Sequence, residues 1–189
     1  MNNQNWYKLK TVQSEEDLKK RRGGQLRLSD IEELKKVCPE ERLYLIKMIQ
    51  AGARIPICKI FNGHIKDLSV FNSVLGNFFF PYLEIFSCFN NQKNFPINHQ
   101  FLLNNEKIKI LYLGGISDSI LPDLSSYSEL KYLYLHFYGS KSVLTPFGSP
   151  PCLEHLIVAQ AGLEKLEKLG PFTSLVILDL SKNIFNSIE

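Results

Sequence analysis

Several patterns that would indicate a membrane or secreted protein are missing from this sequence. No apolar run approaches the ~20 residues needed to cross a bilayer, and the N-terminus, MNNQNWYKLK, lacks the apolar core of a secretory signal. No Asn-x-Ser/Thr sequon occurs anywhere in the chain. We therefore expect no membrane span and a cytoplasmic location, with a nuclear location as the alternative.

Cysteine is scarce and scattered. The four cysteines show no C-x-x-C pair and have no histidine at zinc-ligand spacing. Free cysteine is among the most frequently buried side chains. We therefore expect Cys38, Cys58, Cys88 and Cys152 to be reduced and mostly buried, and we expect neither a metal site nor a cofactor.

Signatures of catalysis are also absent. The chain has no glycine-rich phosphate loop, no G-x-S-x-G elbow, no H-E-x-x-H and no cysteine flanked by an activating base. Of the four histidines, His64, His99, His136 and His155, only the last two lie on neighbouring predicted strands, and no carboxylate or thiol joins these two at ligand spacing. We predict that the protein is not an enzyme.

A regular spacing of aliphatic residues fills the rest of the chain. In LVILDLSKN, residues 175–183, leucines stand at the first, fourth and sixth positions and an asparagine at the ninth. Similar units begin 22 to 25 residues apart, at Leu83, Ile108, Leu130 and Leu153. A sixth unit is predicted from Ile55, and Ile65 and Leu68 fall where later aliphatic residues of that turn belong.

This spacing resembles the leucine-rich repeat family, in its short repeats of about 22–25 residues, over residues 55–189. The resemblance implies an α/β (α+β) fold, a right-handed solenoid of five to six turns with a parallel β-sheet on its concave face. One departure concerns the ninth position, where the family usually has asparagine. That position reads Gly63, Asn91, Ile116, Tyr138, Ala161 and Asn183, which predicts an irregular asparagine ladder.

The N-terminal quarter has a helical pattern. Helices are predicted to begin at Ser14, at Ser29 and at Pro39, and in the last of these Leu43, Ile46 and Ile49 can share one face. A solenoid needs atypical elements at its ends to cover its apolar core. We therefore divide the chain into a helical cap, residues 1–54, and the repeat array, residues 55–189.

The other end of the array has no comparable cap. After Asn183 come Ile184 and Ile188, apolar residues typical of a turn that is still being packed. We expect either that the natural chain continues or that another chain, such as a second copy, covers this edge.

Strand alternation provides a candidate site. Repeat positions one, four and six face the core, and positions three, five and seven face the concave surface. These outer columns are rich in tyrosine, histidine and isoleucine, which suits an interface but also suits strand propensity alone. The predicted partner-binding residues are Phe89, Tyr112, Tyr132, Tyr134, His136, His155, Ile157 and Asp179.

Two weaker patterns lie in the N-terminal quarter. A basic run at a predicted helix end could contact an anionic partner or direct nuclear import, or could form a solvated terminus: Lys19, Lys20, Arg21 and Arg22. The stretch PEERLYLI resembles the start of an F-box, which would imply a ubiquitin-ligase adaptor.

The function we predict is a non-enzymatic scaffold that binds a protein through the concave repeat face. The first alternative is a structural or assembly module that associates through its C-terminal edge. A ubiquitin-ligase adaptor or a nucleic-acid-associated protein is a further alternative, and nucleic acid is the less favoured partner.

Overall fold

A computed structural model describes eight stretches of the chain. They are residues 7–8, 34–50, 57–71, 75–89, 99–115, 121–136, 147–164 and 172–185.

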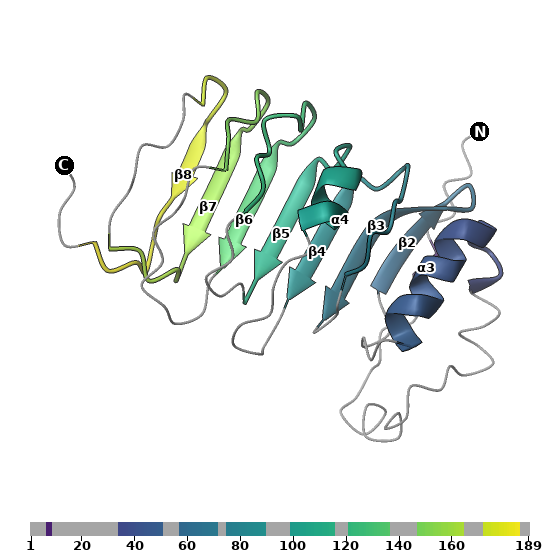
Figure 1. The fold of residues 1–189 in the computed structure, drawn as a ribbon. Helices are drawn as coiled ribbons and strands as arrows, with labels where there is room; N and C mark the ends of the chain where they lie inside the picture. Colours follow the sequence, from purple (N-terminus) through teal and green to yellow (C-terminus); the bar gives the residue numbers. More distant parts are fainter. Residues whose placement is uncertain are drawn as a thin grey trace.

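Eight strands of these stretches form one sheet in which each strand pairs with the next along the chain (Figure 1). Such an order is what a solenoid produces, because each turn adds one strand beside the last. The strands are β1 (Tyr7–Lys8), β2 (Ile57–Phe61), β3 (His64–Phe71), β4 (Ile85–Phe89), β5 (Ile110–Gly114), β6 (Tyr132–His136), β7 (His155–Ala159) and β8 (Ile177–Asp179). The described helices are α3 (Pro39–Gln50) and α4 (His99–Asn104).

Strands β3 to β8 are parallel and in register. The five units predicted to begin at Leu83, Ile108, Leu130, Leu153 and Leu175 each contribute one strand to this stack, so the predicted solenoid of stacked parallel strands is confirmed. Repeat position four forms one continuous row across the sheet. That row runs Leu68, Phe86, Leu111, Leu133, Leu156 and Leu178.

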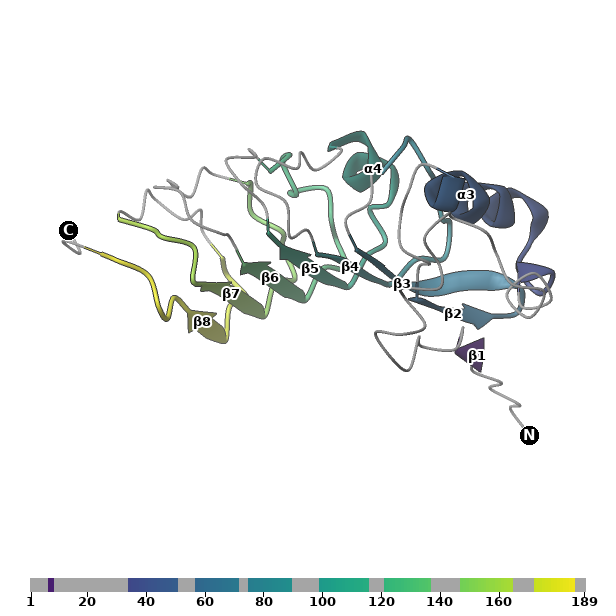
Figure 2. The ribbon, with the colours of Figure 1, turned by 90° about the horizontal axis from the view of Figure 1, so that it is seen from below.

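The side chains alternate between the two faces of the sheet as predicted. In β6, Leu133 and Leu135 are buried, whereas Tyr132 and Tyr134 are partly exposed. The core lies between the sheet and the segments that connect the strands. Both α3 and α4 lie on that same side of the sheet (Figure 2), so among the described residues no helix covers the other face.

The turn after each strand repeats as well. Position eight has a left-handed backbone in three turns, with φ of 70° at Gly115, 53° at Gln160 and 58° at Lys182. The N–H of Gly115 donates to the carbonyl of His136 at 2.7 Å, and that of Gln160 to Ser181 at 3.2 Å. The repeat is therefore present in the backbone and not only in the side chains.

The first predicted unit is different from the others, and the prediction there was wrong. Strands β2 and β3 are antiparallel, joined by a turn in which Asn62 and Gly63 have φ of 50° and 81°. Asn-Gly with two positive φ angles is the strongest short hairpin signal, and it overrides the aliphatic spacing from Ile55. Ile65 and Leu68 consequently lie on β3 itself and not on a returning segment.

Helix α3 begins at Pro39 as predicted, but its buried face is another one. Leu45 and Met48 are buried in the same core as the hairpin, and Leu43 is 49% exposed. The ring of Tyr44 packs against Phe78 and Phe80, which precede β4. The helices predicted from Ser14 and Ser29 lie largely outside the described residues.

Helix α4 is short and lies between β4 and β5 in the sequence. Two of its own side chains, Phe101 and Leu102, are buried in the core. In the part of the chain that the structure describes, no helix combines the length and the apolar character that spanning a membrane requires.

Buried amides connect successive turns. Asn183, at the ninth repeat position, accepts hydrogen bonds from the N–H groups of Ala161 at 2.9 Å and Leu163 at 3.3 Å, and donates to the carbonyl of Val158 at 2.7 Å. This is the backbone-bonding role that the family resemblance implies for that residue. Asn91, the other asparagine of this column, lies outside the described residues.

Asn105 has a comparable role that the sequence reasoning did not predict. It is 2% exposed and it satisfies three backbone groups of the preceding turn and of α4. It accepts from the N–H of Phe80 at 2.8 Å and donates to the carbonyls of Phe78 at 2.9 Å and Phe101 at 2.7 Å.

Candidate protein-binding face

The candidate site is the outer sheet face, which we define as the side chains at repeat positions three, five and seven of β3 to β8. In-register pairing brings the predicted residues onto this one face. They are partly or largely exposed, in contrast to the buried residues between them. They are Phe89, Tyr112, Tyr132, Tyr134, His136, His155, Ile157 and Asp179.

Two ring stacks form the centre of the outer sheet face. The rings of Tyr112 and Tyr134 have centroids 4.3 Å apart and an interplanar angle of 22°. Those of Tyr132 and His155 are 4.5 Å apart at 26°. Neighbouring strands are spaced ~4.8 Å apart, so rings at equal repeat positions meet face to face. Each ring therefore limits the space in which its partner can rotate.

The environment of Tyr112 keeps its hydroxyl neutral. Partial burial raises the pKa of this phenol, and the neighbouring hydroxyl of Tyr134 raises it further. Tyr132 and the carboxylate of Asp67 act in the same direction. Tyr112 therefore presents a neutral hydroxyl that can donate or accept one hydrogen bond to a partner.

An apolar aromatic pair lies beside this centre, toward the N-terminal end of the sheet. The rings of Phe71 and Phe89 are 5.7 Å apart and nearly parallel. Gly114 makes room for this pair, because a Cβ at that position would lie 2.6 Å from Cδ1 of Phe89. The ring of Phe89 thus covers Gly114, which has no side chain at repeat position seven of β5. The Phe89 side chain remains 39% exposed.

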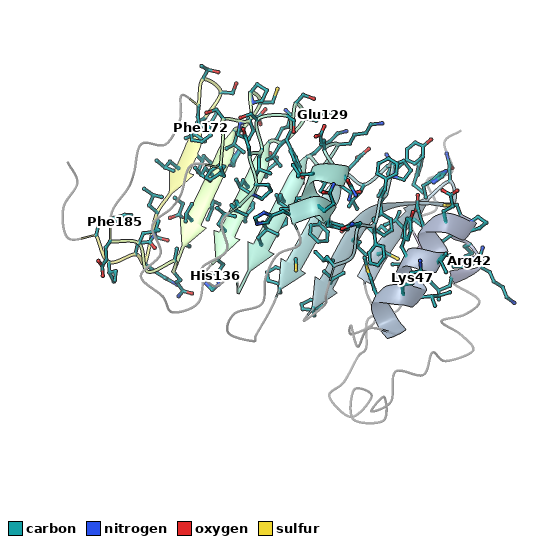
Figure 3. All side chains as sticks on the ribbon, viewed as in Figure 1. Arg42, Lys47, Glu129, His136, Phe172 and Phe185 are labelled. Atoms are coloured by element: carbon teal, nitrogen blue, oxygen red, sulfur yellow. The ribbon has the colours of Figure 1, made fainter. Side chains whose placement is uncertain are left out.

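Polar groups lie at the other end of the outer sheet face. His136, at the end of β6 (Figure 3), pairs its Nε2 with Oε1 of Gln160 at 2.5 Å. Asp179 accepts a hydrogen bond from the N–H of Ser181 at 2.8 Å, and this bond lowers the pKa of its carboxyl. One carboxylate oxygen of Asp179 is therefore engaged by its own turn.

Sequence reasoning missed one strand of this face. Asp67 and Phe71 belong to it through their pairing with Ile85 and Phe89 on β4. Asp67 also forms an ion pair with Lys59 at 2.9 Å. These residues were overlooked because the segment was assigned to a returning turn, and the Asn-Gly signal at residues 62–63 would have identified the strand.

The remaining predicted features lie elsewhere. The basic residues Lys19, Lys20, Arg21 and Arg22 lie outside the described residues. Cys58 and Cys88 are buried as predicted, but Cys152 is exposed and Cys38 is partly exposed. A pocket of about 330 Å³ lies beside α4, lined by residues such as Phe80, Leu103 and Asn105, and none of its lining residues belongs to the outer sheet face.

Comparisons with known proteins give no relative to argue from. Neither the family models and curated proteins compared with the sequence nor the solved structures compared with the fold give a match. The function therefore has to be argued from the side chains themselves.

Proposed function

We propose that this chain is a non-enzymatic protein-interaction module that binds a partner protein through the outer sheet face. The observation that carries the proposal is the pair of exposed ring stacks at the centre of that face. Tyrosine gives a large contact area and a hydroxyl at a small cost in side-chain entropy, and it is enriched among interface hot spots. Stacking on a neighbouring ring lowers that cost further.

The repeat class is part of the same proposal. We assign the array to the leucine-rich repeats, right-handed and with the outer sheet face concave, on its period, on the left-handed residues at position eight and on the hydrogen bonds of Asn183. In that class the sheet is a binding surface. The chemistry implied is binding in the cytoplasm, with no catalytic step.

The chemistry of the face favours a protein over a nucleic acid. Its centre carries tyrosines, a histidine and Ile157. Of its charged residues, Asp179 is acidic, and Asp67 is paired with Lys59 of β2. Nucleic-acid sites instead need basic side chains that neutralise phosphates. A partner protein could present a segment with apolar side chains and exposed backbone carbonyl groups. The apolar side chains would pack on the tyrosine rings of the outer sheet face, and the carbonyl groups would accept hydrogen bonds from the tyrosine hydroxyls.

The test is a quantitative pull-down followed by affinity measurement with the purified partner. We expect Tyr112→Ala/Tyr134→Ala to weaken binding at least ~30-fold, since each truncated hot spot typically costs ~1–2 kcal/mol or more. Phe79→Ala is the matched control, because Phe79 is an aromatic residue, 51% exposed, that precedes β4 and lies off the outer sheet face. Equal affinity of the double variant and wild type would refute the proposal, provided circular dichroism shows both folded.

A second candidate function is assembly through β8. In the last described turn Val176 is 76% exposed, Leu178 46% and Ile184 54%, and an apolar strand edge invites pairing with another chain. If this edge mediates assembly, light scattering of wild type will show a mass that grows with concentration. Val176→Asp/Ile184→Asp should then remain monomeric while keeping the partner affinity of the outer sheet face.

A further inference from the structure

Three residues that are distant in sequence meet where α3 packs on the first hairpin. Cys38 immediately precedes α3, Glu41 lies in its first turn and His64 begins β3. One sulfur, one carboxylate oxygen and one ring nitrogen from these residues lie within 4.8 Å of one another. Sequence spacing did not predict this cluster, because the hairpin and the helix bring together residues separated by 23 positions.

Glu41 is the buried member of the cluster. Its side chain is 1% exposed, and its Oε2 accepts a hydrogen bond from the N–H of Ile65 at 2.7 Å. Its Oε1 lies 3.0 Å from Nδ1 of His64. A carboxylate is buried only where polar partners compensate for lost water. The backbone bond fixes the carboxylate plane and leaves one oxygen directed at the imidazole and the thiol.

The other two members are also held in place. The His64 ring packs against that of Tyr82, with centroids 4.3 Å apart, and the backbone N–H of Cys38 donates to the carbonyl of Gly63 at 2.7 Å. Supporting contacts of this kind orient the ligands of metal sites. The His64 side chain is 33% exposed and Cys38 is partly exposed, so an ion can reach the cluster from solvent.

We propose that Cys38, Glu41 and His64 form a zinc site, with the Cys38 thiolate, Oε1 of Glu41 and a ring nitrogen of His64 as ligands and water in the fourth position. Mixed sulfur, nitrogen and oxygen ligands select zinc, whereas calcium and magnesium take oxygen ligands. Ligand atoms around tetrahedral zinc lie ~3.3–3.8 Å apart. Binding would therefore bring any more distant pair of these atoms, which all lie within 4.8 Å of one another, closer together. It would also move Oε1 of Glu41 and Nδ1 of His64, now 3.0 Å apart, slightly away from each other. The ion ties α3 to the hairpin at the N-terminal end of the sheet.

Binding changes protonation in a defined way. Zinc is bound by the thiolate form of cysteine, so the Cys38 thiol must lose its proton when the ion binds. When the sulfur–zinc bond forms, the sulfur–hydrogen bond breaks and one proton passes to solvent. The apparent affinity for zinc consequently rises with pH.

The test uses reduced protein without a polyhistidine tag, freed of metal by chelation. We expect equilibrium dialysis to give one tightly bound zinc per chain. Cobalt substitution should produce a near-ultraviolet band from thiolate-to-cobalt charge transfer, which other ligands of this site do not give. The zinc dissociation constant should fall as the pH rises from 6 to 8, because the ligands must be deprotonated to bind the ion.

Two variants and one control decide the assignment. Cys38→Ser should abolish the cobalt band and weaken zinc binding at least tenfold, and His64→Gln should weaken it while keeping the band. Cys152→Ser removes an exposed cysteine far along the chain and should leave both unchanged. Less than stoichiometric binding by wild type, or an unchanged band in folded Cys38→Ser, would overturn the proposal.

Discussion

The two ends of the sheet follow the same aliphatic spacing but bury it to very different extents. At the N-terminal end, β2 and α3 cover the stack, and Cys58 and Met48 are both 0% exposed. At the C-terminal end, Leu178 is 46% exposed although it continues the row in which Leu156 is 0% exposed. The repeat pattern decides which side of a strand faces inward, but the next turn provides the burial. Stability in such arrays is close to a sum of neighbouring interfaces.

The largest expected effect compares two leucines of that row. Leu133→Ala opens a cavity between two packed turns and should lower the free energy of unfolding by about 2–5 kcal/mol. Leu178→Ala, on the partly exposed last strand, should lower it by less than about 1 kcal/mol. Urea unfolding monitored by circular dichroism measures both, and similar losses would show that the two ends of the stack do not differ in packing.

Buried amides give the second comparison. Asn105→Ala leaves backbone groups without partners inside the stack and should cost about 2–3 kcal/mol. Asn183→Ala removes the corresponding bonds from a part-buried site in the last turn and should cost about 1 kcal/mol, because water replaces the amide.

Hydrogen exchange distinguishes these variants locally. The N–H of Phe80, which donates to Asn105, should lose protection in Asn105→Ala and keep it in Asn183→Ala. Unchanged protection of Phe80 in the first variant would contradict the bonding scheme.

A third effect, smaller than the second, concerns the hydroxyl of Tyr127, which is fully buried and donates to the carbonyl of Leu102 at 2.5 Å. Tyr127→Phe keeps the ring and should cost about 1 kcal/mol through the unpaired carbonyl. Phe172 occupies the same repeat position in the last turn and lacks this bond. Thermal unfolding of Tyr127→Phe measures the difference, and a change below the error would mean that water restores the lost bond.

The smallest expected effect is a pH dependence at Glu84. A hydrogen bond from Lys66 lowers the pKa of this carboxyl below 4.5, and Lys109 adds to the shift. Its contribution is therefore complete above pH 4.5 and is lost as the pH falls through the lower folded-state pKa. Glu84 is 35% exposed, so screening reduces the effect to a few tenths of a kcal/mol.

Urea midpoints of wild type and Glu84→Gln, followed from pH 6 to pH 3, measure this contribution. We expect the two curves to converge at the acidic end. A constant difference across the whole range would show that the carboxylate charge does not matter there.

Much of the fold could be predicted from the sequence because the determining signals are local. Period and alternation placed β4 to β8 and the residues of the outer sheet face. The first hairpin was missed because an aliphatic spacing was preferred over Asn62-Gly63, and the buried face of α3 was missed because Glu41 lies on it. A buried helix face is normally recognised by its apolar residues, so a glutamate such as Glu41 is assigned to the exposed face.

A row of ion pairs shows a signal that could have been found. Repeat position two reads Glu84, Lys109, Lys131 and Glu154. Glu84 pairs with Lys66 at 2.7 Å, and Glu154 pairs with Lys131 at 2.6 Å. The residues at repeat position two could have been compared for charge, as positions three, five and seven were compared for aromatic residues. That comparison would have predicted the row of ion pairs. The Cys38 cluster could not be found in this way, because no repeat relates its members.

The recurring left-handed residue at position eight gives the array an interchangeable unit. Gln160 and Lys182 stand 22 residues apart and leave their strands through the same backbone geometry. If the segment between two of these left-handed residues is removed or duplicated, the new junction joins two chain ends that have the same backbone conformation. No new loop is then needed at the junction. The outer columns stay aligned because the strands on either side of the junction keep their register. The length of the outer sheet face can therefore change by whole turns while the face itself keeps its pattern.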